Sequence, residues 1–299
     1  MSEPLVYLNG RDVLQHEAAL PFHDAGFVFG ATVTDLCRTF RHQLYRLDDH
    51  LQRFRQSCAL ARVPQTLSDA ELTAIAEQLV EENSRLLHPN ADLALVMFAT
   101  PGPIGYYLGQ TGSGGPTLGM HTFPLPMARF HRLFREGARL VIPKLQRPTA
   151  SLDPRIKQRS RLLWWLAEQE AHDLDPAASA LLLDDTGHVT ETAAANLLLV
   201  RGGTVLTPPR GTVLNGVSLL TVEELCRQLD VPFREEPLTL TDCLTADEAL
   251  LSCTSYCLAS VSHINGQAIP TGGPIYRQLL AAWSRAVGLD IRAQILANG

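Results

Sequence analysis

The sequence predicts an α+β fold built from two domains. Strand and helix patterns are mixed in both halves of the 299-residue chain, without the regular alternation that is typical of a doubly wound parallel sheet. Glycine and proline become frequent after Thr100, which indicates a loop-rich region near the end of the first half. We therefore expect a smaller N-terminal α/β domain at 1–124, an interdomain linker at 125–132 and a larger C-terminal domain at 133–299.

The first half contains short strands and two amphipathic helices. Apolar runs predict strands at 5–8, 33–40, 43–47, 93–99 and 117–124. A first helix follows Asp48 or Asp49, because apolar residues then recur at intervals of three and four positions through Ala61. Ser68 and Glu71 form a capping box that predicts the start of a second helix. The run at 93–99 is continuously apolar and therefore predicts a buried strand.

The second half adds strands and three helices to this pattern. Strands are predicted at 138–143, 179–183, 196–200, 204–207 and 249–252. Helical patterns run from Leu162 to Ala171, from about 216 to 229, and from about 275 to 296. Trp164 and Trp165 lie in the first of these helices, and we expect their bulk to be buried.

Composition and charge exclude several classes of protein. The net charge is −6 and no cluster of lysine and arginine is present, so we expect no nucleic-acid partner. We see no signal peptide and no apolar stretch long enough to cross a bilayer, which predicts a cytoplasmic protein without a membrane partner. The six cysteines form no C-x-x-C pair and no H-E-x-x-H motif occurs, so we expect reduced core cysteines and no metal site.

Lys157 is the first candidate for chemistry. It ends an extended segment just before the apolar helical pattern at 162–171. If the stem of this lysine is buried there, desolvation makes its amine a usable nucleophile or base. A lysine that forms a Schiff base needs this property. The ordinary explanation of the same pattern is a solvated lysine at the start of a helix, because charged residues are mostly exposed.

Other polar residues suggest a carboxylate site and a phosphate site. Glu191 stands among small and apolar residues, where a carboxylate is costly to bury without a cationic partner. Gly216-Val217-Ser218 places backbone N–H groups and a hydroxyl at a helix N-terminus, which favours phosphate binding. Thr254-Ser255 adds hydroxyls at a strand end, and Arg53 supplies a charged clamp. Each also has an ordinary structural explanation, as a helix cap, a strand end, a turn or a solvated helix face.

Taken together and in this order, the motifs resemble those of the fold-type IV pyridoxal-phosphate enzymes, the class IV aminotransferase family. That family includes branched-chain and D-amino-acid aminotransferases and aminodeoxychorismate lyase. The resemblance covers nearly the whole chain. The matching segments are 6–10, 24–30, 45–54, 156–157, 187–191 with 196–197, 214–218, 246–248, 253–255 and 264–266.

The resemblance implies a role for each candidate residue. Lys157 would hold pyridoxal 5'-phosphate as an internal aldimine, and Glu191 would pair with the pyridine nitrogen. The phosphate would be held by Arg53, Val217, Ser218 and Thr254, and the cofactor site would also include Asn196 and Ser255. The family chemistry is a ping-pong transfer of an amino group between a small amino acid or amine and a 2-oxo acid. The resemblance also implies a homodimer, and the loop 101–109 is where we expect residues that reach the partner's pocket.

The substrate pocket departs from the family pattern. Ser160 replaces the asparagine common at the third position after the lysine, and Thr34 falls where D-amino-acid aminotransferases have a tyrosine. The strand at 93–99 lacks a terminal arginine, and Ala31 replaces an acid. Thr34 and Arg161 are the candidate substrate-binding residues, and Arg159 is an alternative to Arg161 for a carboxylate. Two further hypotheses stay open: an aminodeoxychorismate-type lyase, and a catalytically silent binding protein of the same fold.

Overall fold

The computed structural model describes residues 3–112, 114–150 and 152–297. The chain divides into two units: unit 1 contains Met1–Leu125 together with Ile156–Ser160, and unit 2 contains Pro126–Arg155 together with Arg161–Gly299. The chain therefore leaves unit 2 for five residues and then returns to it. This short segment, 156–160, carries Lys157 and packs with unit 1, whereas the sequence analysis assigned it to the C-terminal domain.

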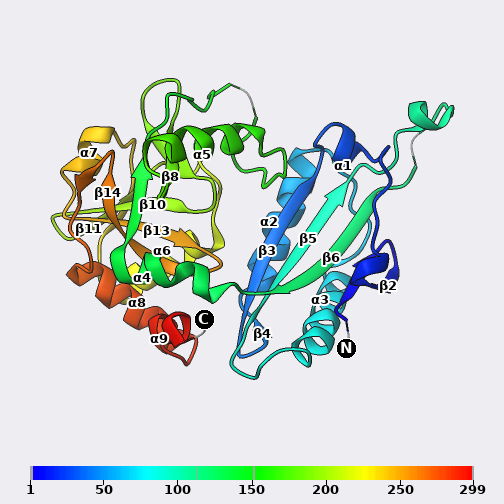
Figure 1. Cartoon of the computed structure of the whole chain (residues 1–299), viewed down its shortest axis with the longest axis horizontal. Helices are drawn as coiled ribbons and strands as arrows, with labels where there is room; N and C mark the ends of the chain where they lie inside the picture. The colour runs from blue at the N-terminus through cyan, green and yellow to red at the C-terminus, as the bar shows by residue number, and fades with distance from the viewer. Residues whose placement is uncertain (1–2, 113, 151, 298–299) are drawn as a thin grey trace. The chain divides into compact units, whose positions relative to one another are not determined.

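Unit 1 is built on a six-stranded sheet with the strand order β2-β1-β6-β5-β3-β4 (Figure 1). Its strands are β1 (Leu5–Leu8), β2 (Arg11–Leu14), β3 (Val33–Phe40), β4 (Gln43–Leu44), β5 (Leu93–Thr100) and β6 (Thr117–Pro124). All of the pairings are antiparallel. The strand predicted at 43–47 is shortened to β4, because the next helix already begins at Leu47.

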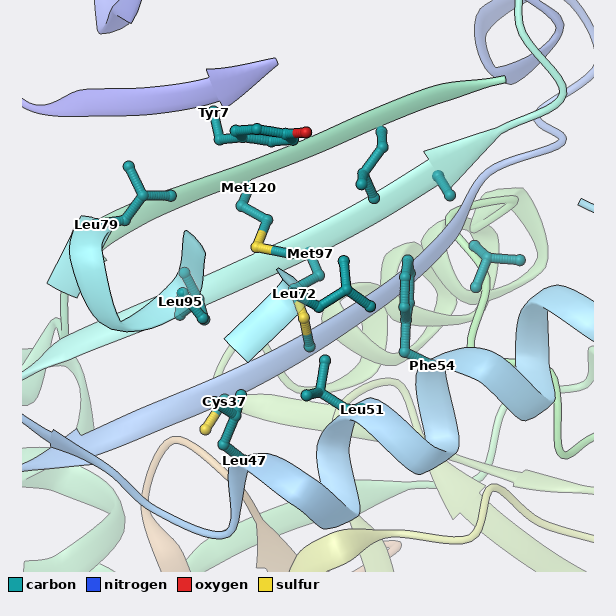
Figure 2. Close-up of a cluster of buried hydrophobic side chains, with 14 of the residues drawn as sticks. Tyr7, Cys37, Leu47, Leu51, Phe54, Leu72, Leu79, Leu95, Met97 and Met120 are labelled. Atoms are coloured by element: carbon teal, nitrogen blue, oxygen red, sulfur yellow. The ribbon is translucent and has the colours of Figure 1, made fainter. Parts of the chain in front are cut away.

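Two long helices cover one face of this sheet. They are α2 (Leu47–Leu60) and α3 (Asp69–Ser84), and the shorter helices of unit 1 are η1 (Gln15–Glu17), α1 (Ala25–Val28) and η2 (Gly105–Leu108). The predicted capping box of α3 is confirmed, since Ser68 and Glu71 bond each other's backbone N–H groups. Figure 2 shows Leu51 and Phe54 of α2 packed against Cys37 and Met97 of the sheet. Because this core occupies the face of the sheet toward α2 and α3, the opposite face of each strand is available for other contacts.

Unit 2 contains a nine-stranded sheet that closes on itself. Its strands are β7 (Ala138–Val141), β8 (Ala178–Leu183), β9 (Val189–Thr192), β10 (Asn196–Arg201), β11 (Thr204–Thr207), β12 (Phe233–Glu235), β13 (Glu248–Cys253), β14 (Cys257–Ile264) and β15 (Gln267–Ala268). The main order is β12-β11-β10-β13-β14-β7-β8-β9, and β9 also pairs with β10. Because of this extra pairing, Glu191 on β9 lies directly opposite Asn196 on β10.

The helices of unit 2 differ from prediction at the C-terminal end. They are η3 (Met127–Phe130), α4 (His131–Glu136), α5 (Leu162–Leu174), α6 (Val217–Gln228), α7 (Leu240–Leu244), α8 (Pro274–Ala286) and α9 (Ile291–Ala297). The single helix predicted at 275–296 is wrong, because the chain breaks it into α8 and α9. Gly288 adopts a positive φ of 69° just after α8, which is the usual glycine signal for a helix end. The side chain of Asp290 then accepts a hydrogen bond from the N–H of Ala293 at 2.9 Å and caps α9.

The tryptophans of α5 are less buried than expected. Trp164 is partly buried against the small core formed by α5, β7 and β8, but Trp165 is 62% exposed. Within the described parts of the chain, no helix is long and apolar enough to span a membrane.

Candidate functional site

Lys157 lies in unit 1, in a short extended segment beside the first residues of β3. The backbone N–H of Thr34 donates to the carbonyl of Lys157 at 2.9 Å, and the N–H of Arg159 donates to the carbonyl of Thr32 at 2.9 Å. On the side of α2, Ser57 Oγ accepts the backbone N–H of Lys157 at 3.1 Å. The backbone of the lysine is therefore fixed by both a strand and a helix.

Arg53 lies on α2, four residues before Ser57, and its guanidinium is held by a buried carboxylate. Nε and Nη2 of Arg53 donate to Oδ2 and Oδ1 of Asp35 at 2.8 and 2.7 Å. Nδ1 of His50 lies 2.7 Å from the same Oδ1. Since residues four apart share one face of a helix, the Arg53 side chain and the contact to Lys157 lie on the same face of α2.

The charges in this cluster compensate each other. Burial by itself would raise the pKa of the Asp35 carboxyl, but the charge of Arg53 and the contact with His50 hold that pKa well below its usual range. Burial lowers the pKa of His50, although Asp35 opposes the shift. The cluster thus contains one anion, one cation and a neutral imidazole near pH 7. Asp35 was not among the predicted site residues, since its only local signal is a carboxylate inside an apolar strand.

Thr34, the first candidate for substrate binding, uses its hydroxyl within the sheet. Its Oγ1 donates to the carbonyl of Met97 at 2.9 Å. Side chains alternate between the two faces of a strand. Since Val33 and Cys37 pack in the core, the side chain of Thr34 lies on the opposite face of the sheet. The hydroxyl is accordingly tied to β5, and the methyl group is what Thr34 offers to a ligand.

Glu191 lies in unit 2, is 7% exposed and is surrounded by donors. Its Oε1 accepts from Nη1 of Arg147 at 2.8 Å, and its Oε2 accepts from Nδ2 of Asn196 at 3.2 Å. The backbone N–H of Leu214 lies 3.2 Å from both oxygens. A cation and N–H donors favour the ionised form of a carboxylate. Arg147 is the cationic partner that the sequence analysis required but did not identify.

The candidate phosphate residues Val217 and Ser218 form the first turn of α6. Asn196 links this turn to β10, because its Nδ2 also donates to the carbonyl of Leu214 at 2.9 Å. A Cβ atom at Gly216 would lie 2.1 Å from Oδ1 of Asn196, so the close approach requires glycine. Glu191, Asn196 and the N-terminus of α6 are thereby held together in unit 2, and the N–H groups of a first helical turn have no acceptor within the helix.

Thr254 and Ser255 lie in the turn between β13 and β14. On β13, Ser252 pairs directly with Asn196 of β10. The hydroxyl of Ser252 is buried and makes no hydrogen bond within the described residues. Because directly opposed residues of an antiparallel pair share a face, Ser252, Asn196 and Glu191 form one polar row across three neighbouring strands. The sequence pointed to Asn196 and Glu191 but not to Ser252.

Arg161, the second candidate for substrate binding, also lies in unit 2. Its Nη2 donates to the carbonyl of Ala193, and its guanidinium carbon lies 5.2 Å from the ring centroid of Trp164. Burial lowers the pKa of Arg161, and the charge of Glu191 counteracts this shift. Arg161 is therefore an electrostatic neighbour of Glu191, whereas Arg159 belongs to unit 1.

The residues fit a ligand that has a phosphate and a basic ring nitrogen. Glu191 supplies a buried carboxylate for such a nitrogen, and α6 supplies a helix N-terminus for the phosphate. The Ser252 hydroxyl has no hydrogen-bond partner among the described residues. A buried hydroxyl normally has one, so this face of the sheet can still form a hydrogen bond with a ligand. A cavity of about 890 Å³ in unit 2, bounded by α4, α8 and α9, includes none of the predicted cofactor residues.

Comparison with known proteins agrees with this donor set. Residues 32–264 match the family described as amino-transferase class IV. The D-alanine aminotransferase of Bacillus licheniformis is 29% identical over 271 residues, which cover 90% of this chain and 91% of the relative. A Methanocaldococcus jannaschii protein with a provisional assignment as a branched-chain-amino-acid aminotransferase is 28% identical over 266 residues, covering 88% of this chain and 89% of that protein.

Solved structures show the same fold. The branched-chain amino acid aminotransferase from Escherichia coli superposes with a TM-score of 0.85 at 20% identity, and the match covers 96% of this chain and 95% of that structure. The branched-chain amino acid aminotransferase from Thermobaculum terrenum, in its PLP form, superposes with a TM-score of 0.82 at 23% identity, covering 98% of this chain and 96% of that structure. The chain thus has the fold-type IV architecture and belongs to the class IV aminotransferases, a family of pyridoxal-phosphate-dependent enzymes.

Proposed function

We propose that this chain transfers an amino group between a small amino acid or amine and a 2-oxo acid, in two half-reactions on one site. The observation that carries the proposal is the fixed backbone of Lys157, held by β3 and by Ser57, in a chain whose family match extends over residues 32–264. A lysine that forms a covalent bond with a cofactor needs such a rigidly held backbone, because its amine must return to one position after each turnover.

Each proposed catalytic residue has a separate task. When bound, pyridoxal phosphate supplies an aldehyde that condenses with amines and a ring that accepts electrons from the bond that breaks. Lys157 would hold this group through its Nζ, and the same Nζ, once released, would take the proton from the donor's Cα. Glu191, with Arg147 beside it, holds a proton at the ring nitrogen. The same residues act in reverse when a 2-oxo acid enters, which gives ping-pong kinetics.

The proposed phosphate residues are Arg53, Val217, Ser218 and Thr254, and the proposed cofactor site further includes Asn196 and Ser255. Asp35 supports this assignment for Arg53, since it fixes two of the guanidinium nitrogens and thereby orients the group. Val217 and Ser218 contribute as the first turn of a 12-residue helix, where the helix dipole attracts an anion. We also propose that the active form is a homodimer.

A visible spectrum of the purified protein tests the proposal. We expect a yellow protein whose cofactor is fixed onto Lys157 by borohydride, and conversion to the pyridoxamine form by one amino acid without an acceptor. Lys157→Ala should lose both the fixation and the conversion. Formation of a keto product without that conversion would point to a lyase. If the protein stays colourless after addition of pyridoxal phosphate, the proposed enzyme activity is excluded, and a binding protein of the same fold is the hypothesis that is left.

A further inference from the structure

The sheet of unit 1 has one face that the long helices do not cover. Side chains alternate between the two faces of a strand. Cys37, Met97 and Met120 point toward α2 and α3, as Figure 2 shows. The alternate positions on the same three strands therefore form the opposite face. They include Thr34 on β3, Phe98 on β5, and Gly119 and His121 on β6.

Arg159 lies on this opposite face. Its guanidinium carbon is 5.4 Å from the centroid of the Phe98 ring, a cation–π distance. Gly119 is the direct partner of Phe98 in the sheet, and a Cβ atom at Gly119 would lie 2.3 Å from the end of that ring. The missing side chain therefore allows the Phe98 ring to lie across β6, where it supports the guanidinium.

Arg159 and Lys157 lie two residues apart in one short segment of unit 1. The segment pairs with the start of β3 at Val33 and Gln158, and residues two apart in an extended chain point the same way. Ile156, one position before Lys157, points to the other side and packs against the core of unit 1. Lys157 and Arg159 thus flank Gln158, the residue that pairs with Val33 of β3.

The positive charge of Arg159 has no anionic partner in the described part of the chain. Arg53 pairs with Asp35 and Arg155 pairs with Asp153, but no carboxylate lies within 4.0 Å of the Arg159 guanidinium in the described residues. Arg159 is exposed in this chain, and partial burial lowers the pKa of its guanidinium, which still stays charged in a protein. A partly desolvated cation over an aromatic ring is suited to a carboxylate, which its planar fork binds through two parallel hydrogen bonds.

We propose that Arg159 is the receptor for the carboxylate of the amino donor and of the 2-oxo acid, so that carboxylate substrates are preferred over simple amines. This assignment rests on the proposed function of Lys157. The Phe98 ring positions the guanidinium, and His121 borders the same site as a neutral group, because burial and then the charge of Arg159 lower the pKa of this histidine. From the sequence, Arg161 was the candidate for this role and Arg159 was its alternative.

Substrate discrimination by the holoenzyme tests the proposal. For an amino acid that the enzyme accepts, we expect Arg159→Gln to raise KM about 10- to 100-fold, as the loss of a charge-assisted hydrogen bond predicts. The decarboxylated amine of the same amino acid should react equally well with wild type and variant. For the amino acid, the KM of Arg159→Lys should lie between the KM of wild type and that of Arg159→Gln. Arg11→Gln, an exposed arginine elsewhere in unit 1, controls for a general loss of charge.

Two readouts do not depend on turnover. Calorimetric titration of isobutyrate onto the holoenzyme should show a dissociation constant at least 10-fold higher in Arg159→Gln. In an NMR titration, the pKa of His121 should rise in Arg159→Gln, and also in wild type when isobutyrate is added. Selective loss of amino-acid binding in Arg161→Gln but not in Arg159→Gln would overturn the assignment. If the protein takes up no cofactor, the proposed function fails, while the isobutyrate and NMR titrations still report on Arg159.

Discussion

Asp35 shows how one buried residue determines the state of its neighbours. Asp35→Asn removes the anion that compensates Arg53, and an uncompensated buried charge destabilises a fold by about 3–5 kcal/mol. We therefore expect a lower free energy of unfolding at pH 7, measured by urea denaturation. Asp69→Asn is a matched control, because Asp69 pairs with Arg55 while its own side chain is 65% exposed. It should change stability little.

The same variant predicts a pH dependence with a definite sign. The folded-state pKa of Asp35 lies below the usual value of 3.8, so its contribution to stability is present above pH 3.8 and is lost as the pH falls further. The unfolding free energies of wild type and Asp35→Asn should therefore converge in acid. A difference that stays constant from pH 7 to pH 2 would contradict the buried ion pair.

Arg147 is a residue that acts through Glu191. In Arg147→Gln the Glu191 carboxylate loses the cation that is hydrogen-bonded to its Oε1, so it takes up a proton more easily. We expect the acidic limb of the pH–rate profile to move to higher pH, and pyridoxal phosphate to bind more weakly by about 10-fold, since a hydrogen bond to a charged group contributes about 1.5–3 kcal/mol. Arg201→Gln, which removes surface pairs with Glu236 and Asp242, should leave both quantities unchanged.

Among the elements, the loop after β5 depends on a close backbone approach. Gly102 has a φ of +88°, and a Cβ atom there would lie 1.9 Å from the carbonyl oxygen of Gly115. Gly109 has a φ of +66° but open space around it. Gly109→Ala should therefore cost only the conformational term of about 1–2 kcal/mol. Gly102→Ala should lower the thermal midpoint further, and equal effects of the two substitutions would argue against the packed loop.

Elements with strong local signals were predictable from the sequence. The capping box of α3 and the fully buried strand β5 follow from residues within a few positions of each other, and the structure confirms both. The long C-terminal helix was mispredicted although Gly288 and Asp290 carried the signals for a break. Trp165 was expected inside but is largely exposed, since burial depends on what packs against a helix and not on its composition.

At the scale of the whole molecule, the family and the fold were predictable, because many short motifs occur in one order along the chain. The partners of the candidate residues were not. Asp35 is 18 residues from Arg53, and Arg147 is 44 residues from Glu191. The tertiary fold brings these pairs together, and no local pattern encodes them.

The loops of unit 1 also present an aromatic surface that suits the proposed dimer. Phe22, Phe27 and Tyr106 are 85%, 70% and 84% exposed. The segments that carry Phe22 and Tyr106 are tied together, because the N–H of Ile104 donates to the carbonyl of His23 at 2.9 Å. Exposed aromatic groups of this kind mark interfaces between proteins. Tyr106 lies within the region 101–109, where partner contacts are expected.

Removal of these aromatic groups should therefore separate the subunits. We expect wild type to sediment as a dimer at micromolar concentration, and the double variant Phe22→Ser/Tyr106→Ser to shift toward the monomer. Because the two side chains are already in solvent, their replacement removes no core packing, and circular dichroism should show an intact fold. Trp165→Ser, which removes an exposed aromatic side chain from unit 2, should leave the dimer unchanged. A wild-type monomer would remove the dimer proposal, and a dimer that survives the double substitution would place the interface on another surface.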